Sequence, residues 1–376
     1  MRLVIYAPAA RMGGARAHLL GLVPELATLA PDDEVLLIAQ PDVIAELPSL
    51  PSSWAVRAEK AQARGFVGRL AWEQQRLPAV AQSWGADVLL SFGSFVPLRC
   101  PCPTVLEAGN ALPFTRTYWQ LLRGEPLARR TQEWARWALL RASLRAAERV
   151  LAPTRAMRQD VVLHLPELAD RVDVALWGVA PVFHARRWTD PPGETVLGVS
   201  KHGVNKEFDL LIAAVARLRQ RRPDIRLVLT GTPEESRWSR RSAALAERLD
   251  LTTAVCWAGD VPNASIPDLI GRARVLVFPT WCESFGLPLA EALAMGAPAI
   301  AADIPACREV GADAARYYAP GDPASLAEEL ETLLDDALCR QELAAAARRR
   351  GSRFQWRDNA IAVRASLQRS LLGRAA

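Results

Sequence analysis

Long apolar runs are missing from this chain of 376 residues. No stretch approaches the roughly 18 to 20 consecutive apolar residues that a bilayer-spanning helix needs. The opening run, MRLVIYAP, breaks at Pro8, so it is too short for a secretory signal peptide and is typical of a first β-strand. These absences predict a cytoplasmic protein without a membrane-spanning helix.

Signatures of metal and disulfide sites are scarce as well. The six cysteines are scattered through the sequence, and the only close pair, Cys100 and Cys102, is separated by one proline instead of forming a CxxC motif. The sequence also has no Asp-x-Asp pair that would hold a divalent ion. We therefore expect free thiols and no required metal.

Lysine is nearly absent among the basic residues. Only Lys60, Lys201 and Lys206 accompany 43 arginines, and the net charge is +5. Lys201 and Lys206 lie in one short segment, SKHGVNK. Because a compact ammonium does not replace a planar guanidinium, this pair indicates a local requirement for compact cations, with chance clustering as the alternative.

Short apolar runs alternate with helical patterns in both halves of the chain, which predicts parallel sheets with crossover helices. A stretch rich in proline and charge, 178–194, is typical of a linker between domains. We predict two doubly wound, Rossmann-like α/β domains, 1–180 and 181–355, followed by a terminal helix over 356–376. Ligands of open α/β sheets bind at the carboxyl ends of the strands, so we expect a central cleft between the two domains.

A buried-strand pattern runs into a helix start at RVLVFPTWCESFGLPLAEALAMG. Glu283 falls in the loop and Glu291 about one turn inside the helix, while the amides of Phe285, Gly286 and Leu287 lie at its positive end. This arrangement suits a ligand with hydroxyl groups at both ends and a phosphate between them. Glu291 as an exposed helix residue is the alternative.

Two glycines, Gly13 and Gly14, follow the first apolar run and open a helical pattern. Glycine allows a close backbone approach, and amides at a helix start suit phosphate. The loop does not match GxGxxG, which disfavours a dinucleotide site, and an ordinary turn is the alternative.

Taken together, these segments resemble the retaining GT-B glycosyltransferases of family 4. The segments that carry the resemblance are ESFGLPLAEALAMGAPAIAADIPACREV, VLAPTRAMRQDV, GVSKHGVNKEFDLLIAA and the N-terminal glycine loop. RLAWEQQRLPAVAQSWGADVLLSFG followed by CPTVLEAGNALPF also resembles members that build bacterial polysaccharides. The resemblance covers nearly the whole chain in the right order.

The resemblance implies a nucleotide-sugar donor, GDP- or UDP-linked, in the C-terminal domain and an acceptor in the N-terminal one, with 356–376 crossing back to the first domain. Glu283 would contact donor sugar hydroxyls, Glu291 the ribose hydroxyls, and Lys201 and Lys206 the diphosphate. The remaining donor-binding positions that it implies are Gly13, Gly14, Ser284, Phe285, Gly286, Leu287, Gly259 and Val261.

The chain departs from the family pattern at two places. Lys201 stands where arginine is usual, and Gly109 and Asn110 stand where many relatives have a histidine near the cleft. Among the four histidines, His18 is the candidate for the acceptor side, together with Asn110. Without a dedicated base, the family's mechanism implies that the departing phosphate helps to deprotonate the acceptor.

The resulting hypothesis is a retaining transfer of a sugar to a glycan or lipid-linked acceptor in polysaccharide or lipopolysaccharide biosynthesis. A GT-B epimerase or phosphorylase and a catalytically silent GT-B scaffold are the alternatives. A glycosidase also uses two carboxylates, but hydrolysis of a neutral glycoside needs no cationic clamp.

The region 116–149 holds eight arginines, three glutamates and three tryptophans and reads as one long helical stretch. Its basic, aromatic face suits peripheral contact with anionic lipid at the inner membrane face. The alternative is a helix that covers the sheet, with its arginines in solvent. Nucleic-acid binding is disfavoured, since no recognised module accompanies the charge.

Overall fold

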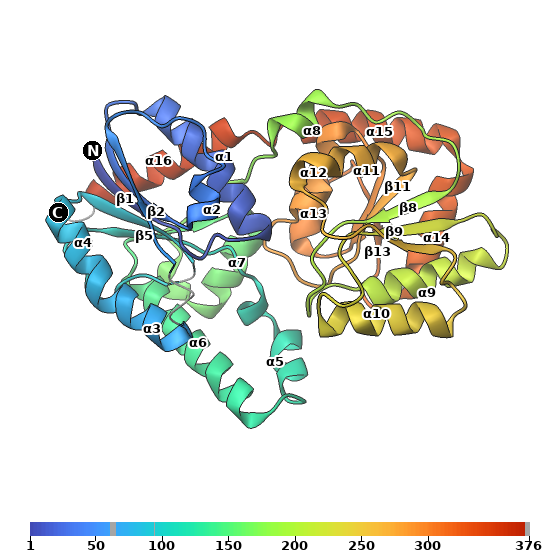
Figure 1. The fold of residues 1–376 in the computed structure, drawn as a ribbon, viewed down its shortest axis with the longest axis horizontal. Helices are drawn as coiled ribbons and strands as arrows, with labels where there is room; N and C mark the ends of the chain where they lie inside the picture. Colours follow the sequence, from blue (N-terminus) through green and yellow to red (C-terminus); the bar gives the residue numbers. More distant parts are fainter. Residues whose placement is uncertain (61–64, 94, 373–376) are drawn as a thin grey trace. The chain divides into compact units, whose positions relative to one another are not determined.

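The computed structural model describes residues 1–60, 65–93 and 95–372. Contacts within the chain divide it into two compact units. Unit 1 comprises Met1–Gly178 and Gln355–Ala376, and unit 2 comprises Val179–Phe354. Figure 1 shows that each unit has its own sheet with helices packed on both faces. The predicted division into domains 1–180 and 181–355 with a terminal helix over 356–376 stays a prediction.

Unit 1 is built on a seven-stranded sheet of order β3-β2-β1-β4-β5-β6-β7, and all neighbouring strands are parallel. Its strands are β1 (Arg2–Tyr6), β2 (Glu34–Ala39), β3 (Trp54–Ala58), β4 (Val88–Phe92), β5 (Thr104–Glu107), β6 (Arg149–Ala152) and β7 (Val172–Val174). Central strands such as β4 are buried throughout, as expected of strands covered on both faces.

Unit 1 also contains α-helices and one π-helical turn among its described residues. They are α1 (Gly13–Leu29), α2 (Pro41–Ile44), α3 (Gly65–Ala71), a π-helix at Trp72–Arg76, α4 (Leu77–Trp84), α5 (Arg116–Leu122), α6 (Leu127–Ala146), α7 (Arg155–His164) and α16 (Trp356–Leu372). Short 3₁₀ turns lie at Leu112–Phe114 and Pro166–Leu168.

The terminal helix α16 packs against α1 in unit 1. Gly21 makes this close contact possible, because a Cβ there would lie 2.1 Å from the indole of Trp356. Val363 and Leu367 of α16 pack with Leu19 and Leu22 of α1 in one hydrophobic core, and all four side chains are fully buried. The last helix of the chain therefore completes the unit in which the chain begins.

Unit 2 is built on a six-stranded parallel sheet of order β10-β9-β8-β11-β12-β13. Its strands are β8 (Thr195–Gly198), β9 (Arg226–Leu229), β10 (Val255–Trp257), β11 (Val275–Phe278), β12 (Ala299–Ala302) and β13 (Arg316–Tyr318). Its helices are α8 (Pro181–Ala185), α9 (Phe208–Arg219), α10 (Arg237–Arg248), α11 (Ile266–Arg272), α12 (Leu287–Met295), α13 (Pro305–Gly311), α14 (Pro323–Asp335) and α15 (Ala337–Gly351), with a 3₁₀ turn at Asn263–Ser265.

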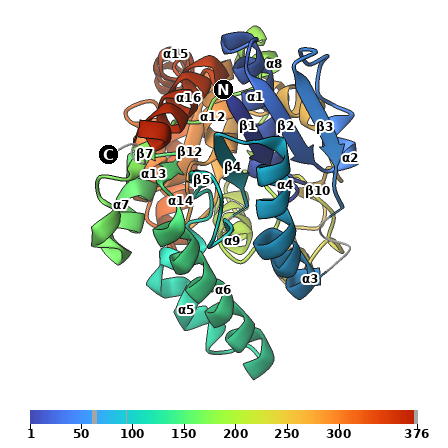
Figure 2. The same ribbon diagram turned by 90° about the vertical axis from the view of Figure 1, so that its left-hand side faces the viewer.

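Two sequence expectations are corrected by the fold. The long helix expected over 116–149 is two helices, α5 and α6, because Gly124 and Pro126 interrupt it; Figure 2 shows both projecting from the sheet of unit 1. The expected linker, 178–194, is packed into unit 2 from Val179 onward. Phe183 is fully buried, and the indole of Trp188 donates a hydrogen bond to the Ala273 carbonyl at 2.8 Å.

Across the described residues, every helix is too short or too polar to cross a bilayer. The cysteines are free thiols, and the sulfurs of Cys100 and Cys102 lie 3.7 Å apart.

Candidate functional site

The loops that leave the carboxyl ends of three strands in unit 2 carry most of the residues singled out in the sequence. Lys201 follows β8, Gly259 follows β10, and Glu283 follows β11. Strands β8 and β11 are neighbours at the centre of the sheet. From β8 the chain adds β9 and β10 on one side, and from β11 it adds β12 and β13 on the other, so the strand order reverses between β8 and β11. Ligands of doubly wound sheets bind at such a switch point, so these loops form the candidate site.

Lys206 and Glu283 come together at this edge of the sheet. The Lys206 ammonium forms an ion pair with Oε1 of Glu283, although 77 residues separate them in the sequence. An isolated antiparallel bridge between Lys206 and Thr280 aligns the two loops. The ammonium also lies 4.4 Å from the ring centroid of Phe278, close enough for a cation–π contact. Both side chains are largely buried, with 11% and 15% of their surface exposed.

Two neutral side chains orient the Glu283 carboxylate further. Asn205 Nδ2 donates to the same Oε1 at 3.2 Å. The Thr280 hydroxyl also lies 3.2 Å from Oε1, and its one proton is shared with the closer carbonyl of Asn205 at 3.0 Å. Among the described residues no hydrogen bond is made to the other oxygen, Oε2. Oε1 of Glu283 is therefore fixed by its neighbours, whereas Oε2 keeps its capacity to accept a hydrogen bond.

Glu207 and Tyr318 support this loop, and neither was singled out in the sequence. The Tyr318 hydroxyl donates to Glu207 Oε2 at 2.8 Å and accepts from the Thr280 amide at 3.1 Å. Burial raises the pKa of Glu207. The two residues are 111 positions apart, so only the fold shows that they act on the same loop.

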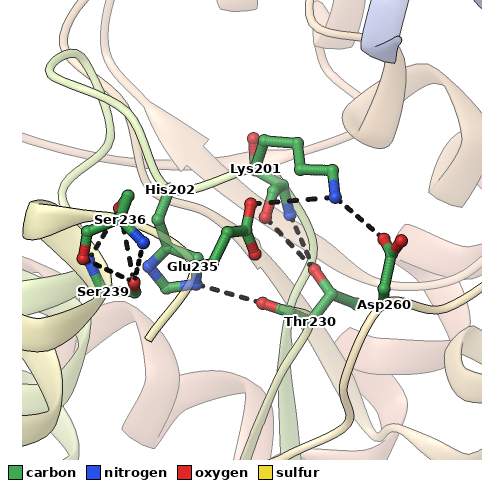
Figure 3. Close-up of polar contacts among 8 residues, drawn as sticks. Lys201, His202, Thr230, Glu235, Ser236, Ser239 and Asp260 are labelled. Atoms are coloured by element: carbon green, nitrogen blue, oxygen red, sulfur yellow. Dashed lines mark hydrogen bonds and ion pairs between the residues drawn. The ribbon is translucent and has the colours of Figure 1, made fainter. Parts of the chain in front are cut away.

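Lys201 lies in a different set of contacts, drawn in Figure 3. Its ammonium donates to Asp260 Oδ1 at 2.8 Å and lies 3.7 Å from Glu235 Oε1. The hydrogen bond with Asp260 is the main cause that raises the pKa of Lys201. The lysine side chain is 51% exposed, so the ammonium remains accessible to a ligand. Sequence reasoning found neither carboxylate.

The backbone around Lys201 is fixed by its neighbours. His202 stacks on Phe208 with ring centroids 3.9 Å apart, and its Nε2 lies 3.0 Å from the Thr230 carbonyl (Figure 3). Burial lowers the pKa of His202, which keeps the ring neutral. The Thr230 hydroxyl in turn accepts from the Ser200 amide at 3.1 Å. His202 is therefore a structural residue that holds the Lys201 loop.

Gly231 and Gly259 join the loops after β9 and β10. Each amide donates to the other carbonyl, at 2.7 and 3.1 Å, and both residues have a positive φ. A Cβ on Gly231 would lie 2.4 Å from Glu235, whereas a Cβ on Gly259 would meet nothing within 4 Å. Gly259, which the resemblance assigns with Val261 to the base pocket, therefore borders open space.

Helix α12 begins directly after the Glu283 loop. Gly286 at its N-cap has a φ of 98°, and a Cβ there would lie 3.0 Å from the ring of Phe278, so both conformation and space require glycine. The side chains of Ser284, Phe285 and Leu287 are buried. The helix start can therefore meet a ligand through backbone groups and the positive end of the helix dipole.

Glu291 lies inside α12 and is only 7% exposed, which overturns the alternative of an exposed helix residue. Burial raises the pKa of Glu291 to about 7. The described residues provide no hydrogen bond or ion pair to its carboxyl group. A buried carboxyl group without a partner is costly, and a polar ligand would remove that cost.

The residues proposed from unit 1 have different surroundings. Gly13 has a φ of 57° at the start of α1, and Gly14 follows it in the helix. His18 is 2% exposed; its ring packs against Trp177 and Trp356, and its Nδ1 lies 2.7 Å from Glu107. It therefore does not reach a surface where an acceptor could contact it.

Asn110, the second acceptor-side candidate, lines a cavity in unit 1 together with aromatic and basic side chains. Its Oδ1 accepts from the Leu112 amide at 3.1 Å. Several of the other lining residues belong to the basic, aromatic region 116–149 noted in the sequence, but the sequence did not show that they meet Arg69 and Gly93 around one cavity. Over the part of the chain that the structure describes, no group of three His, Cys, Asp or Glu residues is arranged to hold a metal ion.

The arrangement of two parallel sheets and the comparisons with known structures confirm the predicted fold class, two Rossmann-like α/β domains of the GT-B type. Sucrose-phosphate synthase from Thermosynechococcus elongatus matches with a TM-score of 0.76 at 17% identity, over 100% of both chains. HepE from Anabaena, solved in complex with UDP-glucose, matches with a TM-score of 0.75 at 18% identity, over 98% of this chain and 99% of that one.

Sequence comparisons give a family match within unit 2 and longer matches to curated relatives. Residues 186–350 match the family model described as Glycosyl transferases group 1. D-inositol 3-phosphate glycosyltransferase from Kineococcus radiotolerans is 31% identical over 257 residues, which are 61% of this chain and 59% of that protein. The chain spans 45% to 59% of the length of the curated relatives that it matches. Together the comparisons support a glycosyltransferase family.

Proposed function

We propose that this chain is a glycosyltransferase that moves a sugar from a GDP- or UDP-sugar to a hydroxyl of a glycan or lipid-linked acceptor, with retention of anomeric configuration. The observation that carries the proposal is the Lys206–Glu283 pair beside the start of α12, at the switch point of the sheet. Two facts support it: HepE was solved with UDP-glucose, and the curated relative named above is a glycosyltransferase.

In this proposal unit 2 binds the donor. Glu283 accepts a sugar hydroxyl through Oε2, and Glu291 accepts the ribose hydroxyls. Lys201, Lys206 and the amides at the start of α12 balance the charge that develops on the diphosphate as its bond to the sugar breaks. As the bond between the sugar and the diphosphate breaks and the bond to the acceptor oxygen forms, the departing phosphate accepts the proton of the acceptor hydroxyl, so no separate base is needed.

The acceptor is held by the N-terminal domain, 1–180, with the donor in 181–355 and the terminal helix 356–376 returning to the first domain. The finer assignments to family 4 and to polysaccharide or lipopolysaccharide biosynthesis belong to the same proposal. So does peripheral contact with the inner membrane face through α5 and α6, where Leu127 and Trp134 are 69% and 58% exposed.

The first test measures sugar transfer by the full-length protein after Glu283→Gln and Lys206→Ala. Each substitution removes a group that acts on the transition state, so we expect kcat/KM to fall about a hundredfold or more. The matched controls are Glu247→Gln and Lys60→Ala, which change exposed residues of the same types and should stay close to the wild type. Unchanged transfer by both site variants would show that the assigned site is wrong.

Donor identity and reaction type are tested by ligand binding and product analysis. A thermal-shift series with UDP, GDP and ADP should show one preferred nucleotide, since a ligand of the folded state raises apparent stability with its affinity. NMR of the product should show the anomeric configuration of the donor. Products formed without any acceptor would favour an epimerase, and nucleotide binding without turnover would favour a silent scaffold.

A further inference from the structure

A cavity of about 280 Å³ in unit 1 combines aromatic rings with paired charges. The residues that the argument uses are Arg69, Tyr118, Trp119, Glu133, Arg136 and Trp137. Ligand pockets in proteins commonly measure roughly 300 to 1,000 Å³, so this cavity suits a small ligand. None of these residues belongs to the donor site of unit 2.

Arg69 is held rigidly in the cavity wall. Its Nε donates to Glu73 Oε1 at 2.7 Å, and its Nη2 donates to the Gly93 carbonyl at 3.1 Å. Glu73 is 1% exposed and also accepts from the Tyr6 hydroxyl at 3.2 Å. The described residues make no hydrogen bond to Arg69 Nη1, so this guanidinium still has a donor for a ligand.

Glu133 is already occupied by other side chains. Its Oε2 accepts from the Tyr118 hydroxyl at 3.0 Å, and its Oε1 accepts from Arg136 Nη1 at 2.8 Å. Burial, together with the charge and the hydrogen bond of Glu133, raises the pKa of Tyr118 to about 12. Because both carboxylate oxygens have donors, Glu133 fixes the wall and does little to repel an anion.

Three tryptophans provide flat apolar faces at the same place. The indole of Trp119 is fixed by a hydrogen bond from Nε1 to the Pro113 carbonyl at 2.8 Å. Its ring centroid lies 4.5 Å from that of Trp134 and 6.2 Å from that of Trp137. Such rings offer an apolar face on which the C–H groups of a sugar ring can stack.

A second cavity, of about 130 Å³, adjoins the first through Trp119, which lines both. Arg123, Arg130 and Trp134 also line it, and its lining includes no acidic residue of the described chain. The two linings together carry four arginines and one glutamate. The pair of cavities therefore favours an anionic ligand.

We propose that these two cavities bind a sugar that carries an anionic group, a phosphate or a carboxylate, as the acceptor of the transfer. The sugar ring lies against the tryptophans, and the anionic group contacts Arg69 and Arg136 or the arginines of the smaller cavity. This inference rests on the proposed function, because it names the acceptor class. A flat anionic membrane is the weaker match, since Arg69 is 18% exposed and lies in a concave wall.

The test uses the full-length protein and isothermal titration with glucose 6-phosphate, glucuronic acid, glucose and inorganic phosphate as probes. We expect the two anionic sugars to bind at least about tenfold more tightly than glucose or inorganic phosphate alone. Equal affinity for glucose and glucose 6-phosphate would overturn the role of the arginines. Equal affinity for inorganic phosphate and glucose 6-phosphate would overturn the role of the tryptophans.

Two matched arginines on α6 provide the variants. The side chains of Arg136 and Arg129 are both 42% exposed, and each forms an ion pair with a glutamate three or four residues earlier in the sequence. Of these two arginines, Arg136 lines the larger cavity and Arg129 lines neither of the two cavities. Arg136→Gln should weaken glucose 6-phosphate binding about tenfold, and Arg129→Gln should change it less than twofold. Equal losses in both variants would indicate diffuse charge attraction and contradict the proposal.

Two further measurements distinguish a sugar ligand from a membrane surface, and the acceptor site from the proposed glycosyltransferase function. Binding to phosphatidylglycerol-containing vesicles without binding to either anionic sugar would replace the sugar site with a membrane surface. Nucleotide binding by unit 2 is followed in parallel and should be equal in wild type, Arg136→Gln and Arg129→Gln. Loss of sugar binding with intact nucleotide binding contradicts only the acceptor site. Sugar binding without nucleotide binding contradicts the proposed function and the acceptor role that rests on it, and leaves only a sugar-binding site in unit 1.

Discussion

At the scale of single residues, Glu291 and Glu283 differ in how their charge is balanced. The Lys206 ammonium and the Asn205 amide both donate to Oε1 of the Glu283 carboxylate. No donor or cation among the described residues stabilises the Glu291 carboxylate, and burial raises its pKa to about 7. The sequence placed both carboxylates near the helix start, but it could not show that one is paired and the other is not.

Glu291 should make the stability of the protein depend on pH. Its pKa is higher in the folded chain than the usual value of 4.5, so its favourable contribution is complete below pH 4.5 and is lost as pH rises through 7. Relative to Glu291→Gln, the wild type should lose about 3 kcal/mol of unfolding free energy between pH 4.5 and pH 8. Urea denaturation of both proteins at several pH values measures this. A constant difference between the two would contradict the assigned burial cost.

At the scale of elements, glycine decides how closely two helices approach. Gly21→Ala should destabilise unit 1, because the new Cβ would lie 2.1 Å from the Trp356 ring between α1 and α16. Overpacking of this kind costs about 1 to 3 kcal/mol. We expect a lower midpoint of thermal unfolding, measured by calorimetry.

The matched control is Gly271→Ala in α11, where a Cβ would meet nothing within 4 Å. There alanine should be neutral or stabilise the helix by about 0.5 to 1 kcal/mol, because it restricts the unfolded chain. Similar destabilisation by both substitutions would contradict the role of the Trp356 contact, because helix propensity favours alanine at both positions.

Element boundaries show where sequence patterns stop being sufficient. The alternation of strands and helices predicted two parallel sheets, and the sheets are present with all neighbouring strands parallel. The region 116–149 was misjudged because its helical periodicity continues on both sides of Gly124 and Pro126, which break it locally. The stretch 178–194 was taken for a linker, although Phe183 and Trp188 attach it to unit 2.

At the scale of the whole molecule, unit 1 depends on a helix from the far end of the chain. Ala360, Val363 and Leu367 of α16 are fully buried in its core, and Asn359 Nδ2 donates to the Ala175 carbonyl at 3.0 Å. Truncation after Phe354 should therefore unfold unit 1 and leave unit 2 folded, since unit 2 is complete between Val179 and Phe354.

Limited proteolysis followed by mass spectrometry tests this expectation. Fragments of the truncated chain should be lost rapidly from 1–178, while a fragment close to unit 2 persists. Equal protection of both units in the truncated and full-length proteins would show that α16 contributes little to the stability of unit 1.

The two parallel sheets and the segment of the candidate donor site could be predicted from the sequence, because strand periodicity, helix starts and the glutamate-flanked glycine are local properties of the chain. Which charges meet became visible in the folded structure. It paired Lys206 with Glu283 and Lys201 with Asp260, buried His18, and gathered Arg69, Trp119 and Arg136 around one cavity. The physical reason is that side-chain contacts between distant segments depend on how strands and helices pack, and sequence spacing does not specify that packing.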